Sequence, residues 1–363
     1  MKYIDEFRDP ALAQKLLARI RGRSTRPVRL MEFCGGHTHA ILRYGLRSLL
    51  PDTVDLRSGP GCPVCVTANA DLDRAIALAA VPGLILTTFG DMLRVPGSTG
   101  TLQNARAAGA DVRLVYSTLD ALQIARENPS RPVVFLGVGF ETTAPTVAAA
   151  VVQADKEGIA NFSVLSLHKL TPPATRAILD AGDLAIHGIL GPGHVTTIIG
   201  SAAWQFLPKE YGVPVAISGF EALDILSGVA ELVDMIEAGA PAVSNAYPRT
   251  VTPGGNPVAM RLMEQVFEIA AADWRGLGPV PGSGLCFRPE FAPFDAALRF
   301  EVDPGPTLEH RNCLCGDVLR GTALPPQCPL FGKACTPSHP VGPCMVSSEG
   351  ACAAYYQFGR DPV

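Results

Sequence analysis

The stretch VRLMEFCGGHTH, residues 28–39, contains an apolar run, a cysteine, a double glycine and the start of a helix-forming segment. The apolar run 28–33 predicts a strand, and residues 37–50 predict the helix that follows. A strand that passes through a glycine turn into a helix is typical of a βαβ unit in a parallel sheet. Cys34 is therefore expected at the carboxyl edge of that sheet, where α/β proteins bind ligands.

The same alternation continues along the chain. Further strands are predicted at 84–89, 112–117, 132–140, 162–167, 185–190 and 213–218. Further helices are predicted at 69–80, 102–108, 119–127, 144–156, 173–181, 221–238 and 258–272. We expect an α/β protein with two tandem parallel-sheet domains, at 1–130 and 131–240, and a third domain at 241–363 that is rich in cysteine and loops.

Composition excludes several classes of protein. Of 363 residues, 47% are hydrophobic and 18% are charged, which rules out a disordered chain. The formal net charge of −4 leaves no basic excess for binding nucleic acid or an anionic membrane. Residues 1–10 contain no apolar leader, and the longest stretch without charged residues, 184–208, is interrupted by Gly-Pro-Gly. We therefore expect a cytoplasmic protein without a membrane span.

The ten cysteines indicate metal or redox chemistry, because a reducing cytosol disfavours a disulfide framework. Six of them lie within 40 residues near the C-terminus: Cys313, Cys315, Cys328, Cys335, Cys344 and Cys352. Four thiolates suit zinc or an iron–sulfur cluster. The gaps are wide and unequal, without the paired short spacings of structural zinc sites, so they favour a cluster held by loops.

A second group of cysteines lies near the N-terminus. Cys62 and Cys65 form a C-x-x-C pattern in GPGCPVC, residues 59–65, which suits a redox pair or metal ligands. With Cys34 they predict a three-cysteine site, and the helix start after Cys34 is expected to stabilise its thiolate. Glu141 and His194 follow other predicted strands in glycine-rich turns. We predict that they serve the site, with a capping or turn role as the alternative.

The motifs CGGHT (34–38), GPGCPVC (59–65) and GFETTAP (139–145), together with the C-terminal cysteine array, resemble the HypD family of NiFe-hydrogenase maturation factors. The resemblance runs from Phe7 to Tyr356. It implies two Rossmann-like α/β domains and a third domain with a 4Fe–4S cluster. It also implies a scaffold on which iron acquires two cyanides and one carbon monoxide, in complex with a small HypC-type chaperone. A HypE-type protein would donate cyanide, and the hydrogenase large subunit would receive the finished unit.

The resemblance also implies roles for the cysteines. Cys34, Cys62 and Cys65 match the family's essential thiols, and we expect Cys34 to bind the iron. Cys62 and Cys65 are either further iron ligands or a dithiol/disulfide pair. The family's cluster spacing matches four cysteines of the C-terminal array: Cys313, Cys328, Cys335 and Cys352. Cys344 could replace Cys313 in this set.

Two functions from other classes remain open at this point. A cluster-dependent disulfide reductase would need the cluster and the Cys62/Cys65 pair, whereas a scaffold would also need Cys34 and a bound iron. A zinc-stabilised binding protein would be colourless, whereas a cluster protein purified without oxygen would be brown. The sequence leaves open whether a maturation scaffold of this kind, with redox capability, is an enzyme.

Overall fold

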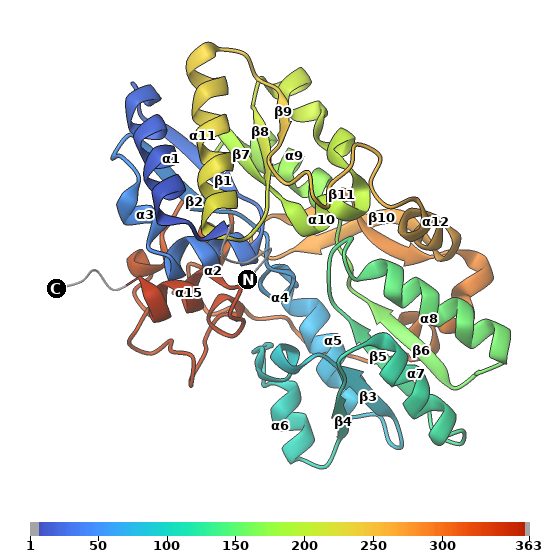
Figure 1. Ribbon diagram of the computed structural model, residues 1–363. Helices are drawn as coiled ribbons and strands as arrows, with labels where there is room; N and C mark the ends of the chain where they lie inside the picture. Colours follow the sequence, from blue (N-terminus) through green and yellow to red (C-terminus); the bar gives the residue numbers. More distant parts are fainter. Residues whose placement is uncertain (1–6, 360–363) are drawn as a thin grey trace.

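The computed structural model describes residues 7–359 and contains two parallel β-sheets (Figure 1). The first sheet has the order β2-β1-β7-β8-β9. Its strands are β1 (Val28–Glu32), β2 (Val54–Ser58), β7 (Gly188–Pro192), β8 (Val215–Ser218) and β9 (Val243–Asn245). All neighbouring strands in it run parallel, with Leu30 of β1 opposite Leu56 of β2 and Gly188 of β7.

The second sheet has the order β4-β3-β5-β6 and is also parallel. Its strands are β3 (Ile85–Thr88), β4 (Asp111–Leu114), β5 (Val133–Gly137) and β6 (Phe162–Ser166). Strands β3 and β5 are buried along their whole length, as expected for central strands with helices on both faces.

Strand pairing corrects one part of the predicted architecture. The α/β class and the parallel sheets are as predicted, but the sheets are not built in tandem, because each of the units 1–130 and 131–240 contributes strands to both. Hydrophobic periodicity identifies a strand, whereas the choice of its partner depends on contacts between distant segments. The domain boundaries at 130 and 240 stay predictions.

Helices cover both faces of the first sheet. Those on one face are α1 (Pro10–Arg23), α2 (Gly35–Arg43) and α11 (Ala222–Ala238), and those on the other are α9 (Thr171–Ala181) and α10 (Gly193–Ile199). The side chain of Asp9 caps α1, and α11 ends where Gly239 adopts a left-handed conformation. Short helical segments complete this half: α3 (Leu46–Leu49), η3 (Ser201–Trp204) and η4 (Leu207–Tyr211).

The second sheet has the same three-layer arrangement. Helices α5 (Asn69–Ala79) and α6 (Leu102–Ala107) lie on one face, and α7 (Thr118–Glu127) and α8 (Ala144–Glu157) on the other. Capping boxes begin α6 at Thr101 and α7 at Ser117, so the helix starts are encoded locally. Between the sheets run α4 (Pro63–Val66) and η2 (Gly90–Arg94).

The predicted helix 258–272 is wrong in its second half. Helix α12 (Pro257–Val266) leads directly into β10 (Phe267–Trp274), which pairs antiparallel with β11 (Gly278–Phe287). A short apolar stretch fits a helix or a strand equally well, and only the pairing with β11 decides between them. Helix α1 and strand β2 were not predicted.

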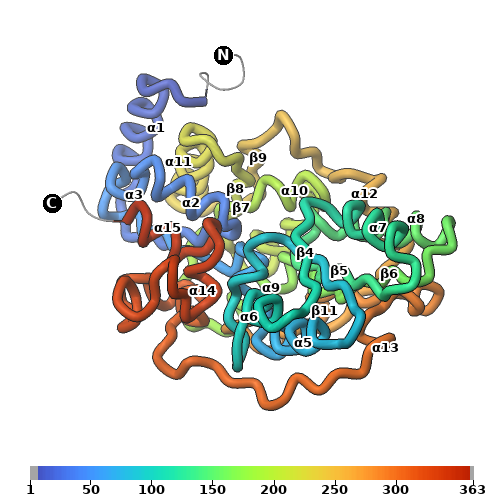
Figure 2. Tube along the Cα trace, turned by 90° about the horizontal axis from the view of Figure 1, so that it is seen from below, coloured from blue at the N-terminus to red at the C-terminus, as the bar shows by residue number. Residues whose placement is uncertain are grey.

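After the hairpin, the chain consists of short elements and loops. These are η5 (Pro289–Phe294), α13 (Ala296–Arg299), α14 (Cys315–Leu319), η6 (Pro325–Gln327), η7 (Pro343–Met345) and α15 (Ala351–Phe358). Helix α15 packs on α2, and both views show the C-terminal segment beside α2 and α3 (Figures 1 and 2). Among residues 7–359, no helix is long and apolar enough to cross a bilayer.

Candidate functional site

Three of the predicted site residues lie at one edge of the first sheet. Cys34 follows β1, Cys62 begins α4 after β2, and His194 follows β7. Because β2, β1 and β7 are neighbouring parallel strands, their carboxyl ends meet at the same edge. Phe220 follows β8 and belongs to the same row of turns.

The turns that carry Cys34 and Cys62 are packed directly against each other. The backbone N–H of Gly35 donates to the carbonyl of Gly61 at 2.9 Å. A Cβ added to Gly61 would lie 2.3 Å from the backbone nitrogen of Cys34. Only glycine therefore fits at position 61, and it holds the C-x-x-C turn against the start of α2.

The thiol of Cys34 is protonated in this environment. Burial raises its pKa to about 12, and the nearby carboxylate of Glu349 adds to the rise. The backbone N–H groups of Gly36 and His37 at the helix start act in the opposite direction, but more weakly. The expected stabilisation of the thiolate by the helix start is thus present and is outweighed by burial.

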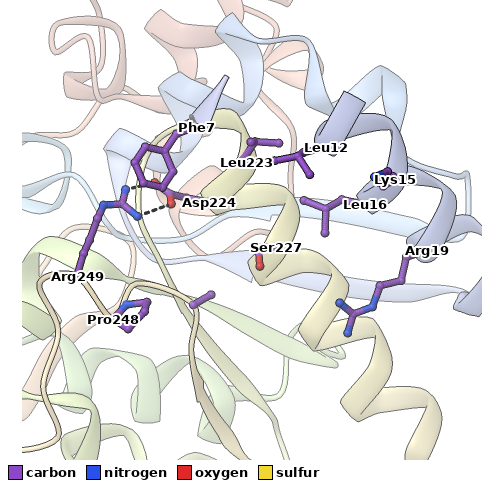
Figure 3. Close-up of a pocket in the computed structure, with 11 residues that line it drawn as sticks. Phe7, Leu12, Lys15, Leu16, Arg19, Leu223, Asp224, Ser227, Pro248 and Arg249 are labelled. Carbon is purple, nitrogen blue, oxygen red and sulfur yellow. Dashed lines mark hydrogen bonds and ion pairs between the residues drawn. The ribbon is translucent and has the colours of Figure 1, made fainter. Parts of the chain in front are cut away.

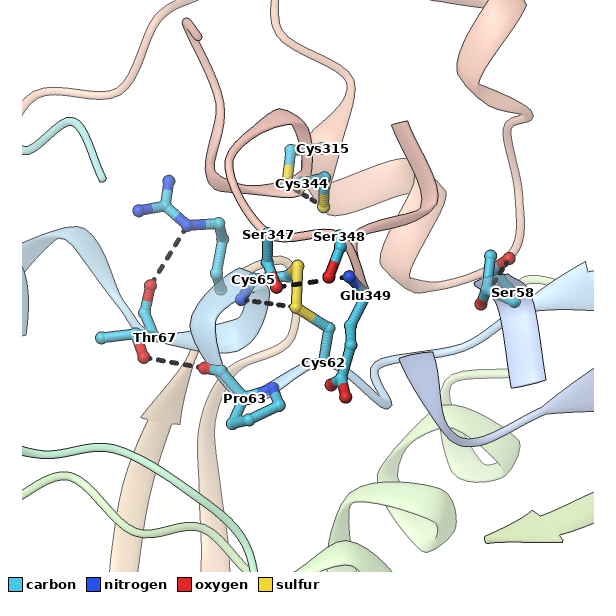
Figure 4. Close-up of a disulfide and its surroundings, with 12 residues drawn as sticks. Ser58, Cys62, Pro63, Cys65, Thr67, Cys315, Cys344, Ser347, Ser348 and Glu349 are labelled. Carbon is cyan, nitrogen blue, oxygen red and sulfur yellow. Dashed lines mark hydrogen bonds between the residues drawn. A yellow bond between two sulfur atoms is a disulfide. The ribbon is translucent and has the colours of Figure 1, made fainter. Parts of the chain in front are cut away.

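Cys62 and Cys65 are joined by a disulfide, one of the two states considered for this pair. Both residues are buried, and the N–H of Cys65 lies 3.2 Å from the sulfur of Cys62. Helix α4, which carries the pair, packs against α14 and η7 of the C-terminal segment (Figure 4). The disulfide therefore lies in the layer between the first sheet and the C-terminal cysteines.

Cys315 and Cys344 form a second close pair. Their Sγ atoms lie 2.8 Å apart, and both side chains are buried in the same apolar cluster as the disulfide (Figure 4). The hydrogen bond from Cys344, together with the charge of Arg275, lowers the pKa of Cys315, while the same contact raises that of Cys344. Cys315 is therefore the more acidic thiol of the pair.

The four cysteines predicted to bind a cluster share one environment. Burial raises the pKa of Cys313 to about 12, and the thiols of Cys315, Cys328 and Cys352 add to the rise. Burial also raises the pKa of Cys335, again with contributions from Cys352 and Cys328. Across residues 7–359, no set of three or more His, Cys, Asp or Glu side chains has the spacing of a site for a single metal ion.

A stack of three rings links His194 to the Cys34 turn. Phe220 lies between the imidazoles, with ring centroids 3.9 Å from His194 and 4.7 Å from His37. A Cβ added to Gly36 would lie 3.0 Å from Phe220, so this ring packs on the start of α2. His37 donates from Nε2 to the carbonyls of Ser218 and Gly219, and burial lowers its pKa to about 4, so it is neutral.

Glu141 is placed differently from the other predicted site residues. It is buried after β5 of the second sheet, and its Oε1 accepts hydrogen bonds from the N–H and hydroxyl of Thr171, the first residue of α9. Burial raises the pKa of its carboxyl to about 7, and Oε2 has no hydrogen-bond partner. Its contacts are those of a helix cap, the alternative considered for this residue.

Two carboxylates beside Cys34 were not predicted. Oε2 of Glu32 accepts from the N–H of Cys34 at 3.1 Å, and burial raises the pKa of Glu32 to about 8. Glu349 is so close to α2 that a Cβ on Gly35 would lie 2.5 Å from it. The sequence does carry a signal for Glu349, which is the only acidic residue from position 318 to position 359.

One sizeable cavity lies away from the cysteines. It measures about 580 Å³ and is bounded by α1, α11 and the segment after β9, where both terminal nitrogens of Arg249 bind Asp224 (Figure 3). None of the predicted site residues lines it. A cavity of about 570 Å³ adjoins the cysteine site instead and is lined in part by Asp91 and Ser348.

Comparison with known proteins gives a consistent result over nearly the whole chain. A family model described as "Hydrogenase formation hypA family", with the short name HypD, matches residues 11–359. The chain is 51% identical to "Hydrogenase maturation factor HypD" of Azotobacter vinelandii, over 99% of this chain and 97% of that protein. It is 48% identical to HypD2 of Bradyrhizobium diazoefficiens and 44% identical to HypD of Escherichia coli K12, over 99% of this chain and 97% and 98% of those proteins.

Proposed function

Because the chain belongs to the HypD family of hydrogenase maturation factors, we propose that it is the scaffold on which the Fe(CN)₂CO unit of NiFe-hydrogenase is assembled. The observation that carries this proposal is the position of Cys34. Its half-buried thiol lies where the C-x-x-C turn and the segment bearing Glu349 both contact the start of α2. Iron(II) with cyanide and carbonyl ligands is soft and prefers thiolate donors.

In this proposal Cys34 binds the iron, together with a ligand from a small HypC-type chaperone. Binding replaces the thiol proton, because a cation lowers the pKa of a coordinating thiol. The backbone N–H groups at the start of α2 provide donors for the cyanide nitrogens. Cys62 and Cys65 serve either as further ligands in the reduced state or as a redox pair.

The partners proposed are the HypC-type chaperone, a HypE-type cyanide donor and, indirectly, the hydrogenase large subunit, all acting in the cytoplasm. The cavity of about 570 Å³ supports access for such a partner, because its lining residue Ser348 directly precedes Glu349. Asp91, which also lines it, raises the pKa of Glu349 and so lies near that carboxyl. The approach to Cys34 would then pass between η2 and the C-terminal segment.

We also propose a resident 4Fe–4S cluster in the C-terminal domain. The residues fit such a group, because four cysteines on short elements influence one another's thiols: Cys313, Cys328, Cys335 and Cys352. Together these four thiols would hold the cluster through its irons. Cys344 contacts both Cys315 and Cys352, so the assignment of Cys313 as the fourth ligand rests on the spacing that it shares with the family. When bound, the cluster supplies one-electron transfer.

The redox capability proposed for the scaffold is a thiol–disulfide exchange. Cys315 loses its proton and attacks the Cys62–Cys65 disulfide, which releases one cysteine of that pair. Cys344 then loses its proton and closes a disulfide with Cys315, which releases the other. Two thiols are oxidised, one disulfide is reduced to two thiols, and the two protons pass from one pair to the other. The packing of α4 on α14 and η7 supports this route.

Infrared spectroscopy tests the proposed scaffold. The protein is purified without oxygen after co-expression with the maturation chaperones, and bands are sought in the cyanide and carbonyl stretching region. We expect these bands in the unmodified protein and in Cys286→Ala, which changes a cysteine of the β10–β11 hairpin. We expect their loss in Cys34→Ala, with the brown cluster retained.

Two outcomes would contradict the proposal. Full bands in Cys34→Ala would remove Cys34 as the iron ligand. No bands in any form, with an intact cluster, would favour the disulfide reductase that acts through Cys62 and Cys65.

A further inference from the structure

A separate polar cavity lies at the edge of the second sheet, outside the cysteine site. It has a volume of about 270 Å³ and lies between α5, the carboxyl end of β6 and the β10–β11 hairpin. Strand β6 and its continuation form isolated bridges to later segments at Val164–Asp295 and Lys169–Gly284. Residues 165–169 and 284–287, which lie between these two bridges, line the cavity.

Lys169 is the unusual residue of this cavity. Only 3% of its side chain is exposed, although a lysine is rarely buried without a close ionic partner. Nζ donates to the carbonyl of Asp273 at 2.5 Å, while the nearest carboxylate oxygen, on Asp71, is 3.8 Å away. That separation exceeds a hydrogen bond, and Nζ also lies over the Trp274 ring, 5.8 Å from its centroid. With one N–H donated to Asp273, the ammonium has N–H groups left for another acceptor. Burial lowers the pKa of Lys169, the mark of an incompletely compensated charge.

The other charged groups of the cavity carry both signs. Asp71, Asp273 and Asp295 line it together with Arg74 and Lys169. Burial raises the pKa of Asp71 and of Asp295, and the charge of Arg74 partly offsets both shifts, so its guanidinium lies near both carboxyls. Arg74 forms no hydrogen bond or ion pair with any residue from 7 to 359.

This charge pattern restricts the class of ligand. A simple anion would meet three carboxylates, and a simple cation would meet Lys169 and Arg74. A molecule with one charge of each sign can satisfy both sets, provided that the charges are close together. The rest of the wall is mixed. Ser166, His168 and Cys286 are polar, while Leu165, Leu285 and Phe287 form an apolar part that accepts a hydrocarbon group.

We propose that this cavity binds a small zwitterion of the class of an α-amino acid with an aliphatic side chain. The carboxylate of the ligand accepts from Lys169 and Arg74, and its ammonium donates to Asp71. The aliphatic group lies against Leu165 and Leu285. This site is independent of the scaffold function, because neither Cys34 nor the C-terminal cysteine array lines it.

Calorimetry on the full-length protein tests the proposal with glycine, alanine, valine and leucine as probes. We expect at least one of them to bind. The two analogues of that probe that lack either the ammonium or the carboxylate should bind at least tenfold more weakly. Arg74→Gln should weaken binding about tenfold, and Arg106→Gln, an exposed arginine on α6, should leave it unchanged. Lys169→Met should abolish binding while the far-ultraviolet circular dichroism stays the same.

Several results would overturn the proposal. The absence of binding for all four probes would do so. Equal affinity for the carboxylate-only analogue would assign the cavity to anions instead. An equal loss of affinity in Arg74→Gln and Arg106→Gln would show that the probe binds outside this cavity. If Lys169→Met fails to fold, the comparison of Arg74→Gln with Arg106→Gln and the binding of the analogues still test the proposed site.

Discussion

The Sγ atoms of Cys315 and Cys344 lie 2.8 Å apart, in the same buried cluster as the Cys62–Cys65 disulfide. Two thiols at this separation need only a small movement to form a disulfide. The contact with Cys344 lowers the pKa of Cys315, and the thiolate is the attacking species in exchange. In the exchange proposed above, the two pairs would react within one protein without a diffusing partner.

Cys315→Ser is therefore expected to prevent internal reduction of the Cys62–Cys65 disulfide. Differential alkylation followed by mass spectrometry measures the fraction of Cys62 that is free after mild reduction without oxygen. We expect at least a tenfold smaller fraction in Cys315→Ser than in Cys286→Ser. Equal fractions in the two variants would show that the Cys315/Cys344 pair does not reduce the disulfide.

Removal of single cysteines tests the cluster ligands. Cys328→Ala and Cys335→Ala should lose the brown absorbance and nearly all bound iron, because an incomplete ligand set does not retain the cluster. Cys344→Ala should keep both, because the family spacing assigns the fourth position to Cys313, although Cys344 contacts Cys352 as well as Cys315. Iron content and absorbance of protein purified without oxygen give the answer. Loss of iron in Cys344→Ala, with iron retained in Cys313→Ala, would reverse the assignment of the fourth ligand.

Gly61→Ala tests the contact between the two site turns. The new Cβ would lie 2.3 Å from the nitrogen of Cys34, so one turn has to move. We expect a loss of about 1–3 kcal/mol in the free energy of unfolding and a strong loss of iron loading. Gly90→Ala is the matched control, because a Cβ there meets nothing within 4 Å. A stable Gly61→Ala protein with normal loading would mean that the contact is unimportant.

The buried carboxyl of Glu141 predicts a specific dependence of stability on pH. Its pKa is about 7 in the folded protein, against 4.5 for an exposed glutamate, so the folded state holds the proton more tightly. The stability from this group is complete below pH 4.5 and is lost as the pH rises through 7. A glutamine at position 141 cannot titrate. Between pH 5 and 8, the free energy of unfolding of Glu141→Gln should therefore fall less than that of the unmodified protein, by on the order of 3 kcal/mol.

Urea unfolding at the two pH values measures this difference. Glu290→Gln, at an exposed position on η5, serves as the control. Its free energy of unfolding should fall between the two pH values by as much as that of the unmodified protein. An unchanged decline in Glu141→Gln would show that Glu141 ionises normally in the folded state.

Local features of the sequence were reliable because the physics behind them is local. The strand that ends before Cys34 was predicted, as were the helices near 102–108 and 119–127. The capping boxes that the structure shows at Thr101 and Ser117 depend on residues three positions apart. The position of Cys34 at a sheet edge followed from the strand–turn–helix order. Its protonated thiol did not, since burial is set by distant segments that pack over it.

The relationships that involve distant residues could not be predicted from the sequence. Glu349 lies against Gly35, and Phe220 packs between His37 and His194, only because separate parts of the chain fold to the same edge. The same applies to the membership of β5 and β6 in the second sheet. One-dimensional periodicity carries no information about which strands become neighbours.

The interleaving of the two sheets also sets an order of events during synthesis. Strand β1 leaves the ribosome early, yet its neighbour β7 follows only after every strand of the second sheet has been made. The second sheet can therefore pair first, while the β1 edge stays open. Cys34, Cys62 and Cys65 are then accessible to oxidants and metal ions for most of translation, and the segment that covers them is made last.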